Sequence, residues 1–169
     1  MISPYTLDYL VAQMCCPCCG HVSPADFTTE MQTRLREAPQ LADIGVGDEL
    51  PTCPVRAAAC GYIVLRESGP GEGAVLLHTW GSPACGTPFQ WAAVVVRDGK
   101  IASIEPTQLT RQAIERANYI EVDARAVAAE FISTTQGFDL EDKTVVDTLR
   151  RCLPDEPSAE NPLATFVGQ

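Results

Sequence analysis

The spacing of apolar residues predicts two kinds of region along the chain. In the N-terminal region, apolar side chains recur at helical spacing over residues 5–14 and again over residues 24–36. Each stretch begins next to a Ser-Pro pair, and Ser is a favoured N-cap while Pro suits the first helical turn. The pattern therefore predicts two N-terminal helices. A loop rich in Pro, Gly and acidic residues follows over residues 37–52.

The middle of the chain has the pattern of β-strands. Runs of β-branched and other apolar residues cover residues 62–66, 74–80, 89–96 and 101–105. A Gly-rich turn separates the first two runs, which predicts a hairpin. Asp98-Gly99 separates the last two and is a strong signal for a two-residue type I′ turn. Together the runs predict an antiparallel meander sheet of about four strands.

The last third of the chain is predicted to be mainly helical. Apolar periodicity indicates helices that end at Ala117, that cover residues 124–132 and that cover residues 140–153. Thr107 or Thr110 can cap the first of these helices, and Asp123 can cap the second. A short apolar run between them, residues 119–122, predicts an edge strand.

These elements predict an α+β fold in which C-terminal helices cover one face of an antiparallel meander sheet. We expect residues 1–61 to form a Cys-rich helical portion that packs with residues 62–153 as one domain. Residues 154–169 carry Pro without an apolar period, so we expect a flexible tail.

The net charge of the chain limits the kinds of partner that it can bind. The formal net charge is −10, and an acidic surface repels phosphate backbones and anionic lipids. We therefore expect no binding to nucleic acid or membranes, whereas a basic protein partner fits. Its contact surface would combine the acidic residues Asp43, Asp48, Glu49, Glu121, Asp123, Glu141 and Asp142.

The cysteines also bear on location and chemistry. The N-terminus lacks the basic and apolar segments of a signal peptide, and no run approaches the ~20 apolar residues of a membrane span. We therefore expect a cytoplasmic protein. The chain has 8 cysteines, and clustered cysteines in the cytosol are more often metal ligands or reactive thiols than disulfides.

Four of the cysteines lie in the stretch Cys15-Cys16-Pro17-Cys18-Cys19-Gly20-His21. From Cys16 it reads Cys-Pro-x-Cys-Gly, the pattern of a zinc knuckle, whose thiolates meet the metal at about 2.3 Å. A second half with the same ends runs from Cys53-Pro54 to Cys60-Gly61, although six residues separate its cysteines. The two halves resemble a zinc ribbon over residues 15–61. The resemblance implies a structural zinc site with the ligands Cys16, Cys19, Cys53 and Cys60.

Other residues compete for the metal. Cys15-x-x-Cys18 and Cys18-x-x-His21 also have ligand spacing. Cys85 lies in a third Cys-Gly stretch, Ser82-Pro83-Ala84-Cys85-Gly86. The alternative to a metal site is a set of buried free thiols that act as small hydrophobic residues.

Function follows from these alternatives. A closed four-cysteine site favours a non-enzymatic binding or regulatory protein, for example an inhibitor or immunity-type protein with a basic target. The first alternative is a thiol-dependent enzyme with Cys85 as nucleophile and His78 as base, in or beside the aromatic segment from Trp80 to Trp91. The second is a redox protein, because the group Cys15, Cys16, Cys18 and Cys19 contains motifs that resemble the thioredoxin and glutaredoxin dithiols.

Overall fold

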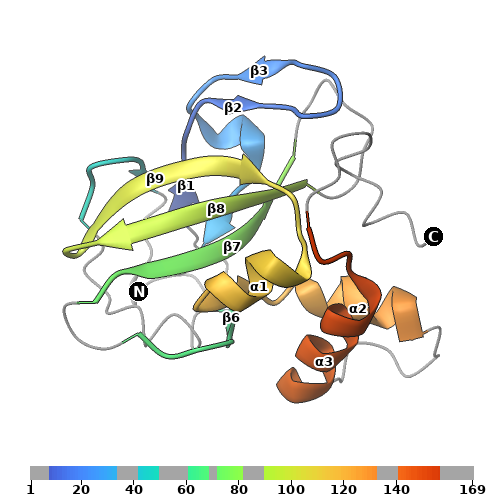
Figure 1. The fold of residues 1–169 in the computed structure, drawn as a ribbon. Helices are drawn as coiled ribbons and strands as arrows, with labels where there is room; N and C mark the ends of the chain where they lie inside the picture. Colours follow the sequence, from blue (N-terminus) through green and yellow to red (C-terminus); the bar gives the residue numbers. More distant parts are fainter. Residues whose placement is uncertain are drawn as a thin grey trace, which may run out of the picture.

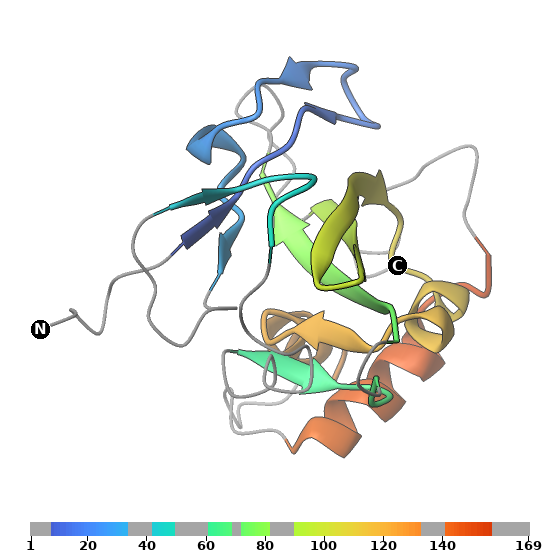
Figure 2. The ribbon, with the colours of Figure 1, turned by 90° about the vertical axis from the view of Figure 1, so that its left-hand side faces the viewer.

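The computed structural model describes residues 8–33, 42–49, 61–68, 72–81, 90–132 and 141–156. These residues form three layers (Figures 1 and 2). A five-stranded sheet lies in the middle, short N-terminal strands cover one face, and three helices cover the other. The expected mixture of a largely antiparallel sheet with helices on one face is confirmed.

The central sheet contains the strands predicted for the middle of the chain. Its order is β6-β10-β7-β8-β9, in which only the pairing of β10 with β7 is parallel. The strands are β6 (Tyr62–Val64), β7 (Ala74–Trp80), β8 (Gln90–Arg97), β9 (Lys100–Thr107) and β10 (Tyr119–Glu121). The prediction of a hairpin between residues 62–66 and 74–80 is wrong, because β10 lies between β6 and β7.

The position of β10 also corrects the predicted edge strand. Tyr119 and Ile120 are both fully buried although they are consecutive, so their side chains are covered on both faces of the sheet. The strand is interior because it pairs with β6 along one edge and with β7 along the other. The length of the apolar run predicted the strand correctly, but its place in the sheet depends on the crossover through the preceding helix.

The turn between β8 and β9 agrees with its sequence. Asp98 and Gly99 have φ values of 53° and 73°, which are the positive angles that a type I′ turn needs at both positions. Arg97 pairs with Lys100 across the turn, and the register shifts once, between Val95 and Val96. The predicted two-residue hairpin is confirmed.

The N-terminal region is the main correction to the predicted fold. Where two helices were expected, the structure has short strands and one 3-10 turn. These elements are β1 (Asp8–Leu10), β2 (Met14–Cys15), β3 (Val22–Ser23), η1 (Phe27–Thr29), β4 (Gln32–Thr33) and β5 (Asp43–Ile44). They form a three-stranded sheet, β4-β1-β5, and a two-stranded ribbon, β2-β3.

The burial pattern explains why the helical prediction failed. Leu10, Ala12, Met14 and Cys16 are buried at every second position, which is the period of a strand. Leu10 and Met14 are four residues apart, so they satisfy the helical period as well. The predicted cap Ser23 is instead buried in β3.

The helical layer agrees with the sequence. It contains α1 (Arg111–Arg116), α2 (Ala124–Ile132) and α3 (Asp142–Cys152). Thr110 caps α1, because its hydroxyl oxygen accepts the backbone N–H of Ala113 at 3.0 Å. The start of α1 is also held by the expected tail: the N–H of Arg111 donates to the carbonyl of Pro154 at 2.9 Å. The rest of the expected tail, residues 157–169, lies outside the described residues.

Neighbouring residues of the central strands point into different cores. Leu76, Ala92 and Tyr119 pack with the N-terminal layer in one cluster. The residues adjacent to these in the sequence point to the other face and pack with the helices in a second cluster, which includes Leu77, Trp91 and Ile120. The sheet therefore separates two hydrophobic cores, and the N-terminal layer belongs to the first of them.

Candidate functional site

The β2-β3 ribbon shapes the cysteine stretch into a tight turn. Cys15 pairs with Val22 across the ribbon. The N–H of Cys16 donates to the carbonyl of His21 at 2.8 Å, and the N–H of Gly20 donates back to the carbonyl of Cys16 at 2.9 Å. Gly20 has a φ of 75°, which glycine adopts without the strain of a side chain. The local backbone therefore has the reversal that the Cys-Pro-x-Cys-Gly pattern predicts.

Cys16 differs from its neighbours in burial and in electrostatics. Its side chain is 1% exposed, and it belongs to the core between the N-terminal layer and the sheet. Burial raises the pKa of the Cys16 thiol, but hydrogen bonds from the backbone of Cys19 and Cys18 and from the side chain of Gln90 outweigh burial. Together with a contact to the Cys19 thiol they lower the pKa to about 7. The site thus increases the thiolate fraction of Cys16 relative to an ordinary cysteine, and the thiolate is the form that binds metals and attacks disulfides.

The structure brings Cys16 and Cys19 together, as the knuckle pattern predicts, because their thiols are hydrogen-bonded. Cys15, Cys18 and Cys19 are exposed. The thiol of Cys15 lies 3.9 Å from the carbonyl of Gly20. His21 is also exposed, and its carbonyl is used by the ribbon.

Two thiols are half of a zinc site. Cys53, Cys60 and Cys85 lie outside the described residues. Within the described ranges, no group of three or more His, Cys, Asp or Glu side chains is arranged to hold a metal ion. The donor chemistry of Cys16 and Cys19 would fit zinc, because both side chains are thiols and the pKa of Cys16 is lowered.

Gln90, which the sequence did not single out, contacts the sulfur of Cys16. Its side-chain Nε2 lies 3.2 Å from Cys16 Sγ, and the two residues are 74 positions apart in the chain. Gln90 is the first residue of β8 and pairs with Trp80 at the end of β7. A cysteine on the ribbon and an amide on the sheet thus meet in one core.

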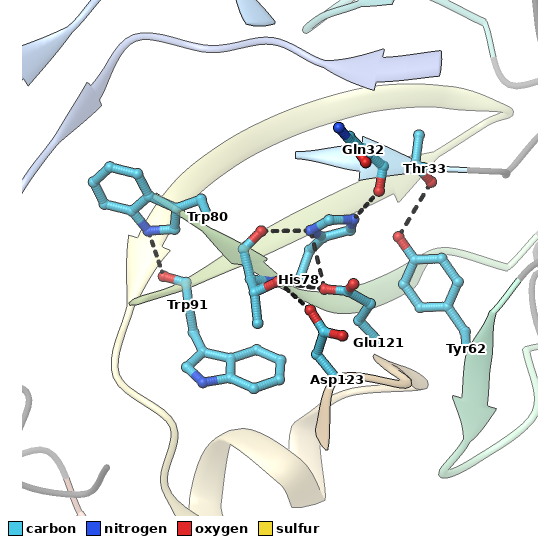
Figure 3. Close-up of polar contacts among 9 residues, drawn as sticks. Gln32, Thr33, Tyr62, His78, Trp80, Trp91, Glu121 and Asp123 are labelled. Carbon is cyan, nitrogen blue, oxygen red and sulfur yellow. Dashed lines mark hydrogen bonds and ion pairs between the residues drawn. The ribbon is translucent and has the colours of Figure 1, made fainter. Parts of the chain in front are cut away.

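His78 is the base predicted for the thiol-dependent enzyme, and each of its ring nitrogens contacts a backbone carbonyl (Figure 3). It is 1% exposed on β7. Its Nε2 lies 3.1 Å from the carbonyl oxygen of Gln32, and its Nδ1 lies 2.6 Å from the carbonyl oxygen of Thr79. Both ring nitrogens of His78 thus contact backbone carbonyls, and the contact with Gln32 links β7 to β4 of the N-terminal layer. Cys85, the nucleophile predicted beside His78, lies outside the described residues.

Acidic side chains meet His78 where the parallel strands β7 and β10 end. Glu121 Oε2 lies 3.4 Å from His78 Nδ1 and accepts the Thr79 hydroxyl at 2.6 Å. The same hydroxyl lies 3.2 Å from Asp123 Oδ2. Burial raises the pKa of Asp123, and the charge of Glu121 and a hydrogen bond to it raise it further. The sequence missed this cluster because it depends on the pairing of β10 with β7.

The aromatic segment has its ends in the core. Trp80 and Trp91 are both buried, and the indole N–H of Trp80 donates to the carbonyl of Trp91 at 3.1 Å (Figure 3). The two indoles therefore contribute to packing. The residues between Gly81 and Gln90, with Cys85 among them, lie outside the described part of the chain.

Comparison with known proteins gives no match: no family model, no curated protein and no solved structure matches this chain. In the part of the chain that the structure describes, no helix is long and apolar enough to cross a bilayer.

Proposed function

We propose that this protein binds one zinc ion through Cys16 and Cys19 and two further ligands, and that it acts as a non-enzymatic binding or regulatory protein. The observation that carries the proposal is the environment of Cys16: a tight turn whose backbone N–H groups point at a buried sulfur and lower its pKa to about 7. N–H groups directed at a sulfur stabilise a metal-bound thiolate. A closed site of this kind contributes folding free energy and has no open position for substrate.

The remaining ligands come from the cysteines beyond the described residues. Cys53 and Cys60 complete the ribbon-like set of four, as the resemblance implies. Cys85 competes with them, because it precedes Gln90 by five residues and Gln90 contacts Cys16. Five residues of extended chain place the Cα atoms of Cys85 and Gln90 at most roughly 18 Å apart. Because Gln90 contacts Cys16, this length also limits the distance between Cys85 and Cys16.

The test is the metal content and the thiol count of protein purified without chelator. We expect about one zinc per chain and four protected thiols. Cys16→Ser and Cys19→Ser should lose the metal, whereas Cys152→Ser, in an exposed position on α3, should retain it. Comparison of Cys53→Ser and Cys60→Ser with Cys85→Ser then identifies the other ligands. Wild-type protein without metal and with every thiol reactive would refute the proposal.

A basic protein is the proposed partner, because the net charge is −10. Of the acidic residues assigned to the contact surface, all but the partly buried Glu121 are exposed. Asp142 pairs with Arg125, and Glu121 accepts hydrogen bonds from Thr79. A pull-down from host lysate at low and high salt tests this surface, because ionic strength screens such contacts. A partner that is retained equally at both salt concentrations would contradict an electrostatic contact.

The second candidate is a dithiol redox protein. It is favoured by the contact between the Cys16 and Cys19 thiols and by the lowered pKa of Cys16, since redox dithiols attack as thiolates. Metal-free protein should then form a reversible Cys16–Cys19 disulfide under mild oxidation, which mass spectrometry of the alkylated protein detects. Tight zinc binding that blocks this oxidation would favour the structural site.

A further inference from the structure

The contact between Gln90 and Cys16 joins the two halves of the molecule at the cysteine site. Three donors point at the Cys16 sulfur: the backbone N–H groups of Cys18 and Cys19 and the side-chain amide of Gln90. The first two belong to the turn itself. Gln90 comes from the central sheet, so its donor reaches the sulfur only when the ribbon is docked on the sheet.

The side chain of Gln90 is buried, and its backbone is part of the sheet. It is 1% exposed, and its backbone is fixed by pairing with Trp80 at the end of the seven-residue ladder between β7 and β8. A buried amide N–H without an acceptor destabilises a protein, and the sulfur supplies that acceptor. The amide oxygen Oε1 is also buried, and no hydrogen-bond partner is found for it among the described residues.

The chemistry of the sulfur indicates a role for this donor. A neutral thiol is a weak acceptor, whereas a thiolate, free or bound to a metal, accepts N–H donors well. Donors that contact metal ligands orient the ligands and stabilise their charge, and their loss typically lowers metal affinity by about 10–100-fold. A donor from another layer has a further consequence, because it makes zinc affinity depend on the docking of the ribbon.

We propose that Gln90 is a positioning residue of the cysteine site: its amide N–H holds the Cys16 sulfur in the orientation that binds a thiophilic divalent cation. This inference rests on the proposed zinc site. It also gives the cysteine site a polar link to the central sheet, in addition to the packing of Cys16 in the shared core.

The test compares two variants of Gln90 with a matched control. Gln90→Met keeps the size of the side chain and removes the donor. Gln90→Glu keeps the shape and replaces the donor with a second carboxylate oxygen, which repels a thiolate. Gln112→Glu makes the same change of charge on α1, which packs on the opposite face of the sheet.

Zinc affinity is measured by competition with a chromogenic chelator, and thiolate ligation by the sulfur-to-metal charge-transfer band of the cobalt-loaded protein. We expect Gln90→Met to weaken zinc binding by about 10–100-fold and to shift the cobalt band. Gln90→Glu should weaken binding more, and Gln112→Glu should leave both readouts unchanged. Thermal melts of the metal-free variants distinguish positioning from packing, because a packing role would lower their stability and leave the affinity of the folded fraction unchanged.

Three outcomes would overturn the inference. Unchanged zinc affinity in Gln90→Met would show that the amide does not act on the sulfur. Full affinity in Gln90→Glu would show that zinc binding needs no N–H donor at this position. If wild-type protein binds no metal, the proposed zinc site fails, and the alkylation rate of Cys16 in the same variants then tests the hydrogen bond by itself. Equal rates in wild type and Gln90→Met would overturn it.

Discussion

The two layers on either side of the central sheet have opposite structural character. The helical layer contains an eleven-residue helix, α3, and a nine-residue helix, α2, whose backbone hydrogen bonds are local. The N-terminal layer contains strands of only two or three residues. Strands this short are not stable by themselves. The N-terminal layer therefore depends on contacts with the sheet and, in our proposal, on a metal, and the chemistry-bearing cysteines lie in the layer with less local structure.

Loss of the metal should have the largest effect, and it should act on the N-terminal layer. Cys16→Ser is expected to lower the free energy of unfolding by several kcal/mol, on the order of 3 or more, because one lost ligand removes most of the contribution of a structural zinc site. Amides of residues 8–33 should lose protection from hydrogen exchange, and those of α2 and α3 should keep it. Identical melts of wild-type protein with and without a strong chelator would contradict this prediction.

Truncation of one core residue in each layer sharpens the comparison. Leu10 and Leu149 are both fully buried, and they belong to different cores. Replacing either with Ala should cost about 2–5 kcal/mol of stability, measured by denaturant unfolding. Leu10→Ala should also weaken zinc binding, whereas Leu149→Ala should leave the zinc affinity of the folded protein unchanged. Equal loss of affinity in both variants would show that the two layers respond as one unit.

A change in the shared sheet should affect both layers equally. Gly99→Val is expected to lower stability by about 1 kcal/mol or more, because valine is strained at the positive φ of the type I′ turn. Asp98→Asn is the control, since Asn tolerates positive φ. Hydrogen exchange should increase in the N-terminal strands and in the helices to the same extent. Protection lost from one layer and not from the other would contradict a common scaffold.

The smallest effect concerns the carboxyl pair at the ends of β7 and β10. Burial and the nearby Glu121 raise the pKa of Asp123, so the protonated form is stabilised in the folded protein. Stability from this group is complete below the pKa of the unfolded chain, about 3.9, and is lost as the pH rises through the folded value. Asp123→Asn cannot ionise, so it should be slightly more stable than wild type at pH 7. Equal stability of the two proteins at every pH would contradict the raised pKa.

Where the local sequence pattern and the tertiary contacts favour the same secondary structure, the sequence alone was sufficient to predict that structure. The run from Ala74 to Trp80, the Asp98-Gly99 turn and the helix over residues 124–132 were predicted with the bounds or geometry that the structure shows. In each case nearby residues carry the signal. Alternating or β-branched apolar residues predict the strand, the Asp-Gly pair predicts a turn with positive φ, and an apolar stripe at helical spacing predicts the helix. The local reversal at Cys16–Gly20 was predicted for the same reason, because the pattern lies within five residues.

Tertiary structure decided what adjacent residues leave open. Leu10 and Met14 fit both a helix and a strand, and burial against the central sheet selected the strand. The run at residues 119–122 predicted a strand but not its neighbours, because the parallel pairing with β7 depends on the crossover through α1. Gln90 carries no signal of its own in the sequence. Its role depends on a contact with Cys16 across 74 positions, which exists only because the folded sheet and the ribbon share one core.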